Sequence, residues 1–249
     1  MRCISNMNNI KAVITALFAA LAVSGYAVNP YPQLEVKAER AFGYGEWASA
    51  AAMFDLMLEQ KPDVPGTYGR AIVANGMRGA TSEQMRLLSQ ALDNHVPFDS
   101  VFANVEMWGS HLGRPRVYEK FLVDTREAYP WMRRAINATL LKYYTFRDNG
   151  PEMVEYSLAM LEGAPDNTVF LESLARGYML TGRIPEGLDT YKRILAVEPD
   201  NYDVLLTLGN WYAMNPDGVE NGRVYLERAY AMHPTPYVAR LLEQKPVGR

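Results

Sequence analysis

The chain has 249 residues, of which 49% are hydrophobic and 11% aromatic. This length allows one or two globular domains, and the composition excludes a chain that is disordered throughout. The 25 basic against 28 acidic residues give a formal net charge of −3, which argues against a protein that binds nucleic acid. One cysteine, Cys3, and three scattered histidines provide no zinc cluster, disulfide framework or Cys–His nucleophile pair.

Residues 1–27 have the pattern of a secretory signal peptide. Positive charge from Arg2 and Lys11 precedes an apolar stretch over residues 12–23, and small residues precede a cleavage position after Ala27. An uncleaved membrane anchor is the alternative, although the apolar stretch only reaches the lower length limit for a span of ~30 Å. We therefore expect an exported protein, periplasmic if the source is bacterial and otherwise secreted, whose mature chain does not insert into a membrane.

Beyond the leader, residues 28–249 are predicted to form one helical repeat domain. Six of the fifteen prolines recur with separations of 35, 33, 35, 34 and 35 residues. These prolines are Pro62, Pro97, Pro130, Pro165, Pro199 and Pro234. In the clearest recurrence, Leu171, Leu174, Ala175 and Tyr178 return 34 residues later as Leu205, Leu208, Gly209 and Tyr212. Self-similarity at such a period is typical of stacked repeats.

Each period is predicted to contain two amphipathic helices. Leucine and tyrosine four positions apart, as at Leu174 and Tyr178, lie on one side of a helix, and the small Ala175 lets a neighbouring helix approach closely. A glycine then ends the first helix at Gly45, Gly79, Gly113 and Gly182. Neither helix can bury its apolar side alone, so consecutive pairs are expected to stack.

The second period differs in its first helix, which carries Gly66, Gly69 and Gly76. Glycine inside a helix costs about 1 kcal/mol relative to alanine. These glycines therefore indicate either a compliant region or a tight contact with another helix.

The pattern resembles that of the tetratricopeptide repeat family. Its motif in residues 168–201 runs Leu171, Leu174, Ala175, Tyr178, Gly187, Tyr191, Pro199. The resemblance is also strong in residues 202–236 and 31–64, and it is degenerate through residues 65–167. It implies an all-α fold, a right-handed superhelical solenoid of antiparallel helix pairs with about six repeats and a C-terminal capping helix over residues 236–244.

No motif of a common enzyme class is present. The sequence lacks HExxH, GxxxxGK[ST], GxSxG and a complete GxGxxG, and its histidines are too far apart to share a metal ion. We therefore predict no catalytic residue, no metal site and no cofactor. Two alternatives stay open, a hydrolase that uses carboxylates on the repeat scaffold and a glycan-binding surface built from tyrosines and tryptophans. The tryptophans are Trp47, Trp108, Trp131 and Trp211.

The resemblance also implies where a protein or peptide partner binds. In this family the first helices line a concave groove, and the position two residues before each tyrosine of the repeated column faces it. These positions hold Lys142, Arg176 and Asn210, whose side chains could bind backbone carbonyls or an acidic segment of an extended peptide. The competing interpretation is that they are solvated polar residues on an exposed helix side.

Further groove candidates are Glu172, Met179, Leu206, Met214 and Met107. Methionine adapts well to variable peptide surfaces, although it also fills cores. The predicted function is that of an exported scaffold or adaptor that holds another polypeptide in its groove, for example in the assembly of a cell-envelope complex.

Overall fold

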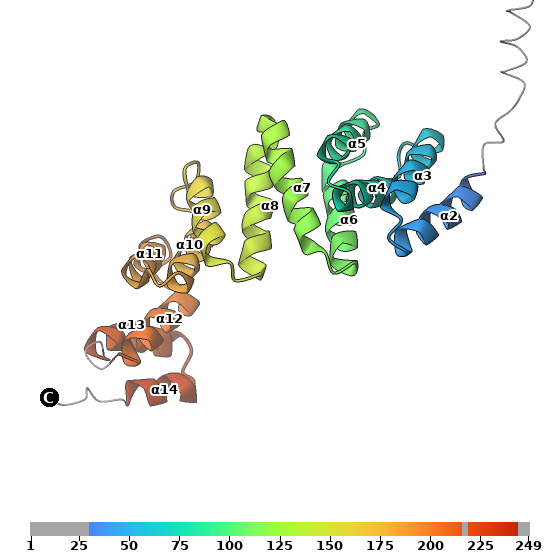
Figure 1. The fold of residues 1–249 in the computed structure, drawn as a ribbon. Coiled ribbons are helices and arrows are strands. Elements are labelled where there is room, and N and C mark those ends of the chain that lie inside the picture. Colours follow the sequence, from blue (N-terminus) through green and yellow to red (C-terminus); the bar gives the residue numbers. More distant parts are fainter. Residues whose placement is uncertain (1–29, 216–218, 244–249) are drawn as a thin grey trace, which may run out of the picture. The chain divides into compact units, whose positions relative to one another are not determined.

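The computed structural model describes residues 30–215 and 219–243 (Figure 1). The predicted leader, residues 1–27, lies outside them. Across the described residues the regular secondary structure is helical, with no strand. The predicted all-α fold is therefore confirmed.

In the described part of the chain, twelve helices follow one another as six pairs. The first helices are α2 (Tyr31–Gly43), α4 (Pro65–Met77), α6 (Phe98–His111), α8 (Arg133–Phe146), α10 (Thr168–Leu180) and α12 (Tyr202–Ala213). The second helices are α3 (Trp47–Gln60), α5 (Thr81–Asp93), α7 (Pro115–Ala128), α9 (Gly150–Leu161), α11 (Ile184–Val197) and α13 (Val219–Met232). A short 3-10 helix, η1 (Pro130–Met132), precedes α8, and α14 (Pro236–Leu242) follows the last pair. Successive first helices begin 33 to 35 residues apart, so the proline period is the period of the helix pairs.

A residue with left-handed backbone follows the first helix in five of these pairs. Four are the predicted glycines Gly45 (φ 75°), Gly79 (φ 71°), Gly113 (φ 65°) and Gly182 (φ 75°). Glycine adopts positive φ without a clash of its side chain, so the prediction that glycines end these helices is confirmed. After α8 the position is held instead by Asp148, with φ 52°.

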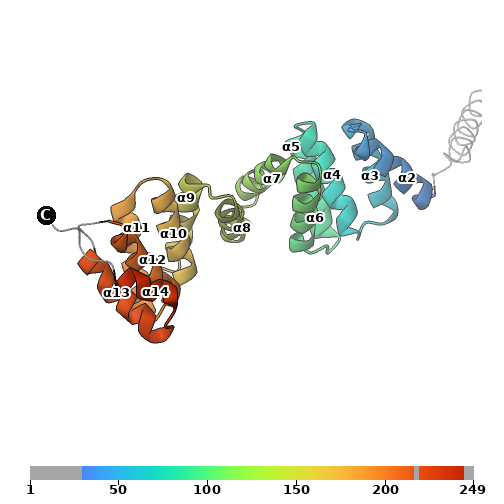
Figure 2. The same cartoon turned by 90° about the horizontal axis from the view of Figure 1, so that it is seen from below.

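The chain divides into two compact units, which are described separately. Unit 1 runs to Phe121 and unit 2 begins at Leu122, so the boundary falls within α7. Within unit 1, α4 lies between α3 and α6 (Figures 1 and 2). Residues 71–75 of α4 are buried without interruption, which is more than one helical turn. Helix α4 is therefore enclosed on all sides in its middle.

The glycines of α4 explain this close packing. A Cβ atom on Gly69 would lie only 2.4 Å from Cβ of Asn104 on α6, and one on Gly76 would lie 2.7 Å from Val117 Cγ1 on α7. Asn104 and Val117 thus occupy space that any larger side chain on α4 would need. Of the two interpretations of the α4 glycines, the tight contact is confirmed for Gly69 and Gly76.

An aromatic cluster joins α2, the first helix of the first pair, to α6, the first helix of the third pair. Phe42 on α2 makes edge-to-face contacts with Trp108 on α6 and with Phe54 on α3, at centroid distances of 5.6 and 5.8 Å. Arg70 of α4 lies over the Phe54 and Trp108 rings and forms an ion pair of 2.6 Å with Glu39 of α2. These contacts bring side chains of α2, α3 and α6 together around Arg70 of α4.

In unit 2, α10 lies in a core shared with its neighbours. Leu171, Leu174 and Tyr178 of α10 belong to one buried cluster with residues of α11 and α12. The residues contributed by those two helices are Leu188, Tyr191, Ile194, Val204 and Leu208. The repeated leucine and tyrosine positions therefore supply the packing between pairs.

Two of the phased prolines accept hydrogen bonds through their carbonyl oxygens. Arg193 Nη2 on α11 donates to the Pro165 oxygen over 3.3 Å, and Arg228 Nη2 on α13 donates to the Pro199 oxygen. In both cases the arginine comes from the second helix of the pair that follows the proline. These bonds tie the segment before a pair to that pair.

Candidate functional site

Lys142, Arg176 and Asn210 take equivalent positions on α8, α10 and α12 in unit 2. Each lies two residues before a tyrosine, and two residues correspond to about 200° around a helix. The three side chains therefore point away from the tyrosine side of each helix. Lys142 and Arg176 are exposed, and Asn210 is partly exposed.

A second, apolar column runs beside the first. Phe146, Leu180 and Met214 lie four residues, or one helical turn, after the polar column. Phe146 and Leu180 are hence on the same side of α8 and α10 as the polar residues, and Met214 directly follows the last residue of α12. The three apolar side chains are 86%, 49% and 73% exposed. Only Met214 was among the candidates from sequence, although the spacing of 34 residues would have revealed all three. We call Lys142, Phe146, Arg176, Leu180, Asn210 and Met214 the α8–α10–α12 face.

Arg176 is engaged with an acidic side chain in the structure. Its Nη2 donates to the Asp148 carboxylate, which lies in the left-handed turn after α8. The two side chains are 48% and 56% exposed, so the ion pair lies in solvent. It connects the end of α8 to α10.

Asn210 is held by α14. The Tyr237 hydroxyl donates to Asn210 Oδ1 over 2.9 Å, which orients the amide with its oxygen toward α14. Tyr237 is itself 43% exposed. The helix after the last pair therefore contributes a side chain at the edge of the α8–α10–α12 face.

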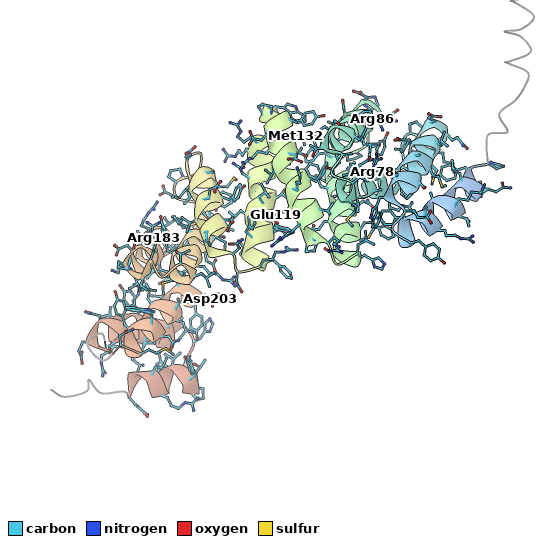
Figure 3. All side chains as sticks on the ribbon, in the orientation of Figure 1. Arg78, Arg86, Glu119, Met132, Arg183 and Asp203 are labelled. Atoms are coloured by element: carbon cyan, nitrogen blue, oxygen red, sulfur yellow. The ribbon has the colours of Figure 1, made fainter. Side chains whose placement is uncertain are left out.

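Two more arginines lie just beyond the C-terminal ends of first helices, where the helix dipole favours cations. Arg147 follows α8, with its guanidinium 3.6 Å from the Tyr143 ring centroid. Arg183, labelled in Figure 3, lies in the turn after α10, 4.3 Å from the Tyr178 centroid, and pairs with Glu186 over 2.9 Å. This end of the first helices is consequently rich in positive charge.

Acidic residues on the first helices of unit 2 lie nearer their N-terminal ends. Glu172 is exposed on the early part of α10, and Asp203 is exposed in the first turn of α12. Burial raises the pKa of Tyr191 on α11, Glu172 adds to the rise and Arg176 opposes it. Glu172 and Arg176 are therefore within electrostatic reach of the same buried ring.

The remaining candidates from sequence have different surroundings. Met179 is partly buried in the unit 2 core, and its sulfur lies 2.7 Å from where a Cβ of Gly187 would be. Leu206 is also partly buried, against the cluster of α13 and α14. Met107 lies on α6 of unit 1 and is 51% exposed. A binding role for these three residues stays a prediction.

The tryptophans do not gather on one exposed surface of either unit. In unit 1, Trp47 and Trp108 both make edge-to-face contacts with Phe42. In unit 2, Trp211 packs against the core, whereas Trp131 is 69% exposed. A glycan-binding platform would need several exposed rings side by side, so this alternative gains no support from their positions.

Within residues 30–215 and 219–243, no three His, Cys, Asp or Glu side chains lie together in a way that could hold a metal ion. Over the same ranges, no helix combines the length and the apolar character needed to cross a bilayer.

No protein-family model matches the sequence, and a search of curated protein sequences finds no match. Among solved structures, the chain is similar to the C-terminal part of a TPR repeat-containing protein from Cytophaga hutchinsonii, with 16% identity and a TM-score of 0.45 over 78% of this chain and 77% of that one. It is also similar to YrrB, described as a TPR protein with an unusual peptide-binding site, with 15% identity and a TM-score of 0.32 over 89% and 95%. A third is a tetratricopeptide repeat protein from Parabacteroides merdae, with 13% identity and a TM-score of 0.38 over 86% and 97%. Because these TM-scores lie below 0.5, the fold assignment rests on the helix pairing and the repeat period.

Proposed function

We propose that this protein is an exported scaffold without catalytic activity, and that the α8–α10–α12 face binds a segment of another polypeptide. One observation carries the proposal. Three successive first helices each present a polar side chain and, one turn later, an exposed apolar side chain at the same repeat position. Exposed apolar residues in register contribute little to the core, and their recurrence at one repeat position favours a role in binding a partner.

The chemistry of the face suits an extended peptide. Lys142, Arg176 and Asn210 can donate hydrogen bonds to carbonyl or carboxylate oxygens of a peptide that crosses the three helices. The apolar column would bury side chains of the same peptide. Such a surface combines polar anchoring with apolar burial, as most peptide-binding surfaces do. We place the protein among assembly factors or subunits of cell-envelope complexes.

Selection from a random 12-residue peptide library displayed on phage, with the purified chain as bait, tests the binding surface. We expect selected peptides to lose binding to a Leu180→Asp variant, because the aspartate puts a charge within the apolar column. Val197→Asp is the matched control, since Val197 lies on α11 and is 45% exposed against 49% for Leu180. Peptides that bind both variants equally well would place the binding surface elsewhere.

Export is proposed from the pattern of residues 1–27 alone. Expression of the full chain in a Gram-negative host should yield a periplasmic protein whose N-terminal sequence begins at Val28. Edman sequencing of the purified product measures this directly. A product in the membrane fraction that keeps residues 1–27 would favour the uncleaved anchor.

A further inference from the structure

We infer that the partner segment is an extended peptide with acidic and apolar side chains, and that Asp148 competes with its carboxylates for Arg176. The inference rests on the proposed function, because it concerns the same face. It adds the chemical class of the ligand and a residue that sets its selectivity.

The charge at the C-terminal ends of the first helices favours an acidic ligand. Helix α8 carries no acidic residue, Lys142 lies in its C-terminal half and Arg147 directly follows it, whereas Arg133 and Arg134 lie at its N-terminal end. Lys142 and Arg176 are both exposed on the face itself. The acidic Glu172 and Asp203 lie toward the other end of their helices. A peptide that runs along the polar and apolar columns therefore meets mainly positive charge.

The structure already holds one carboxylate on this face. Asp148 accepts a hydrogen bond from Arg176 Nη2, so the arginine is able to bind a carboxylate where it lies. Exposed ion pairs of this kind contribute only a fraction of a kcal/mol up to about 1 kcal/mol. A ligand carboxylate can therefore displace Asp148, whereas a neutral peptide offers Arg176 only carbonyl oxygens, which bind a guanidinium more weakly than a carboxylate does.

Asp148 places a carboxylate at a repeat position that four other pairs fill with glycine. The residue takes a left-handed conformation, φ 52°, at this turn. Glycine fits such a turn without strain, so the turn itself does not require an acidic side chain. What the aspartate adds over glycine is its contact with Arg176. We therefore assign Asp148 the role of an internal competitor that raises the threshold for peptide binding.

A model ligand needs both an acidic and an apolar side chain at regular intervals. An extended chain advances about 3.3 Å per residue, so a peptide with a period of three residues presents both components about every 10 Å along its length. A suitable probe is a fluorescein-labelled peptide of four Asp-Leu-Ser repeats. Matched probes of four Asn-Leu-Ser or four Asp-Ser-Ser repeats lack the acidic or the apolar component.

Fluorescence anisotropy at low salt measures the three affinities for the full mature chain. The Asp-Leu-Ser peptide should bind at least about tenfold more tightly than either matched probe, because each lacks one component. Asp148→Asn should tighten binding of the Asp-Leu-Ser peptide about two- to fivefold and leave the Asn-Leu-Ser peptide unchanged. Asparagine tolerates the left-handed turn, so the backbone is preserved.

The control variant is Asp189→Asn. Asp189 lies on α11 in the same unit and pairs with Lys192 over 3.1 Å, so its removal changes the net charge equally but away from Arg176. Equal tightening by the two variants, or equal binding of the Asp-Leu-Ser and Asn-Leu-Ser peptides, would overturn the inference and leave the proposed function standing. If none of the three peptides binds and the library yields no ligand, both fail.

Discussion

Helices α4 and α10 are each the first helix of the middle pair of their unit, but α4 is enclosed by its neighbours and α10 keeps one side exposed to solvent. On α4, residues 71–75 are buried all round. On α10, Leu174 and Tyr178 are buried, whereas Arg176 and Leu180 are exposed. The same repeat therefore produces a closed helix in unit 1 and a helix with a solvent-facing side in unit 2.

The difference has its cause in side-chain size. The glycines of α4 let α6 come close enough for Asn104 to occupy the space of a missing side chain at Gly69. Phe42 of α2 also contacts Trp108 of α6, and Arg70 of α4 lies over the Trp108 ring. On α10 the exposed side carries the long side chains of Arg176 and Leu180. The glycines that face α6 thus help to enclose α4, whereas this side of α10 stays available for a partner.

The largest effect should come from the buried side of α10. Tyr178→Ala should reduce the free energy of unfolding by about 3 kcal/mol or more, because it leaves a cavity in the unit 2 core. Leu180→Ala, two residues later and half exposed, should cost much less. Urea denaturation followed by circular dichroism compares the two. Similar losses for both would mean that α10 has no open side.

In unit 1, Gly69→Ala should destabilise the protein by about 2 kcal/mol, although alanine normally favours a helix. The reason is the 2.4 Å approach to Asn104. Gly66→Ala in the same helix is the control, since the nearest atom to its new Cβ would be 3.5 Å away. That variant should be neutral or more stable. Thermal melts should give a lower Tm for Gly69→Ala and an unchanged or higher Tm for Gly66→Ala, and a stabilised Gly69→Ala protein would refute the tight contact.

The two arginine ion pairs offer a smaller but direct comparison. Arg70 is 11% exposed in its pair with Glu39 and lies over two aromatic rings, whereas Arg176 is 48% exposed. Arg70→Gln should cost about 1–2 kcal/mol of unfolding free energy, and Arg176→Gln under about 0.5 kcal/mol. Chemical denaturation measures both. Equal losses of unfolding free energy for the two variants would mean that the ion pair on α4 is no more stabilising than the exposed one on α10.

The smallest effect concerns pH at a junction of unit 2. Glu198 accepts hydrogen bonds from Thr168 over 2.7 Å and from Asn201 over 2.8 Å, and these bonds lower its pKa. The stabilisation is present above the ordinary pKa of about 4.5 and is lost as the pH falls below it. The Tm should therefore fall more between about pH 6 and pH 3 for the wild type than for Glu198→Gln. Parallel Tm curves would show that the carboxylate contributes nothing.

Much of the fold is predictable because its signals are local. A proline, a turn glycine such as Gly182 and a leucine–tyrosine spacing each act within one helix pair, and they place the helices correctly. The enclosure of α4 is different, since it depends on Asn104, more than thirty residues after Gly69. The sequence alone allows two interpretations of these glycines because the residue that packs against a glycine can lie far away along the chain.

The site is predictable in part for the same reason. Repeat register locates Lys142, Arg176 and Asn210 on equivalent positions of three helices. It does not reveal that Asp148 reaches Arg176 or that Tyr237 reaches Asn210, because these contacts cross from one repeat to the next. Met179 and Leu206 are partly buried. Residues at the boundary between the buried and the exposed side of a helix can pack against an adjacent helix or face solvent, and the sequence does not decide between the two.

The hydrogen bonds from Arg193 and Arg228 to proline carbonyls make the stability of earlier segments of unit 2 depend on later helices. Each bond lets a later helix hold the stretch of chain that comes before its own pair. Loss of α13 would remove Arg228 and leave the Pro199 carbonyl without this hydrogen bond. The segment that leads into α12 would then be held less firmly. Fraying should therefore travel from the C-terminus toward the middle of the chain, and successive C-terminal truncations should be digested by proteases in that order.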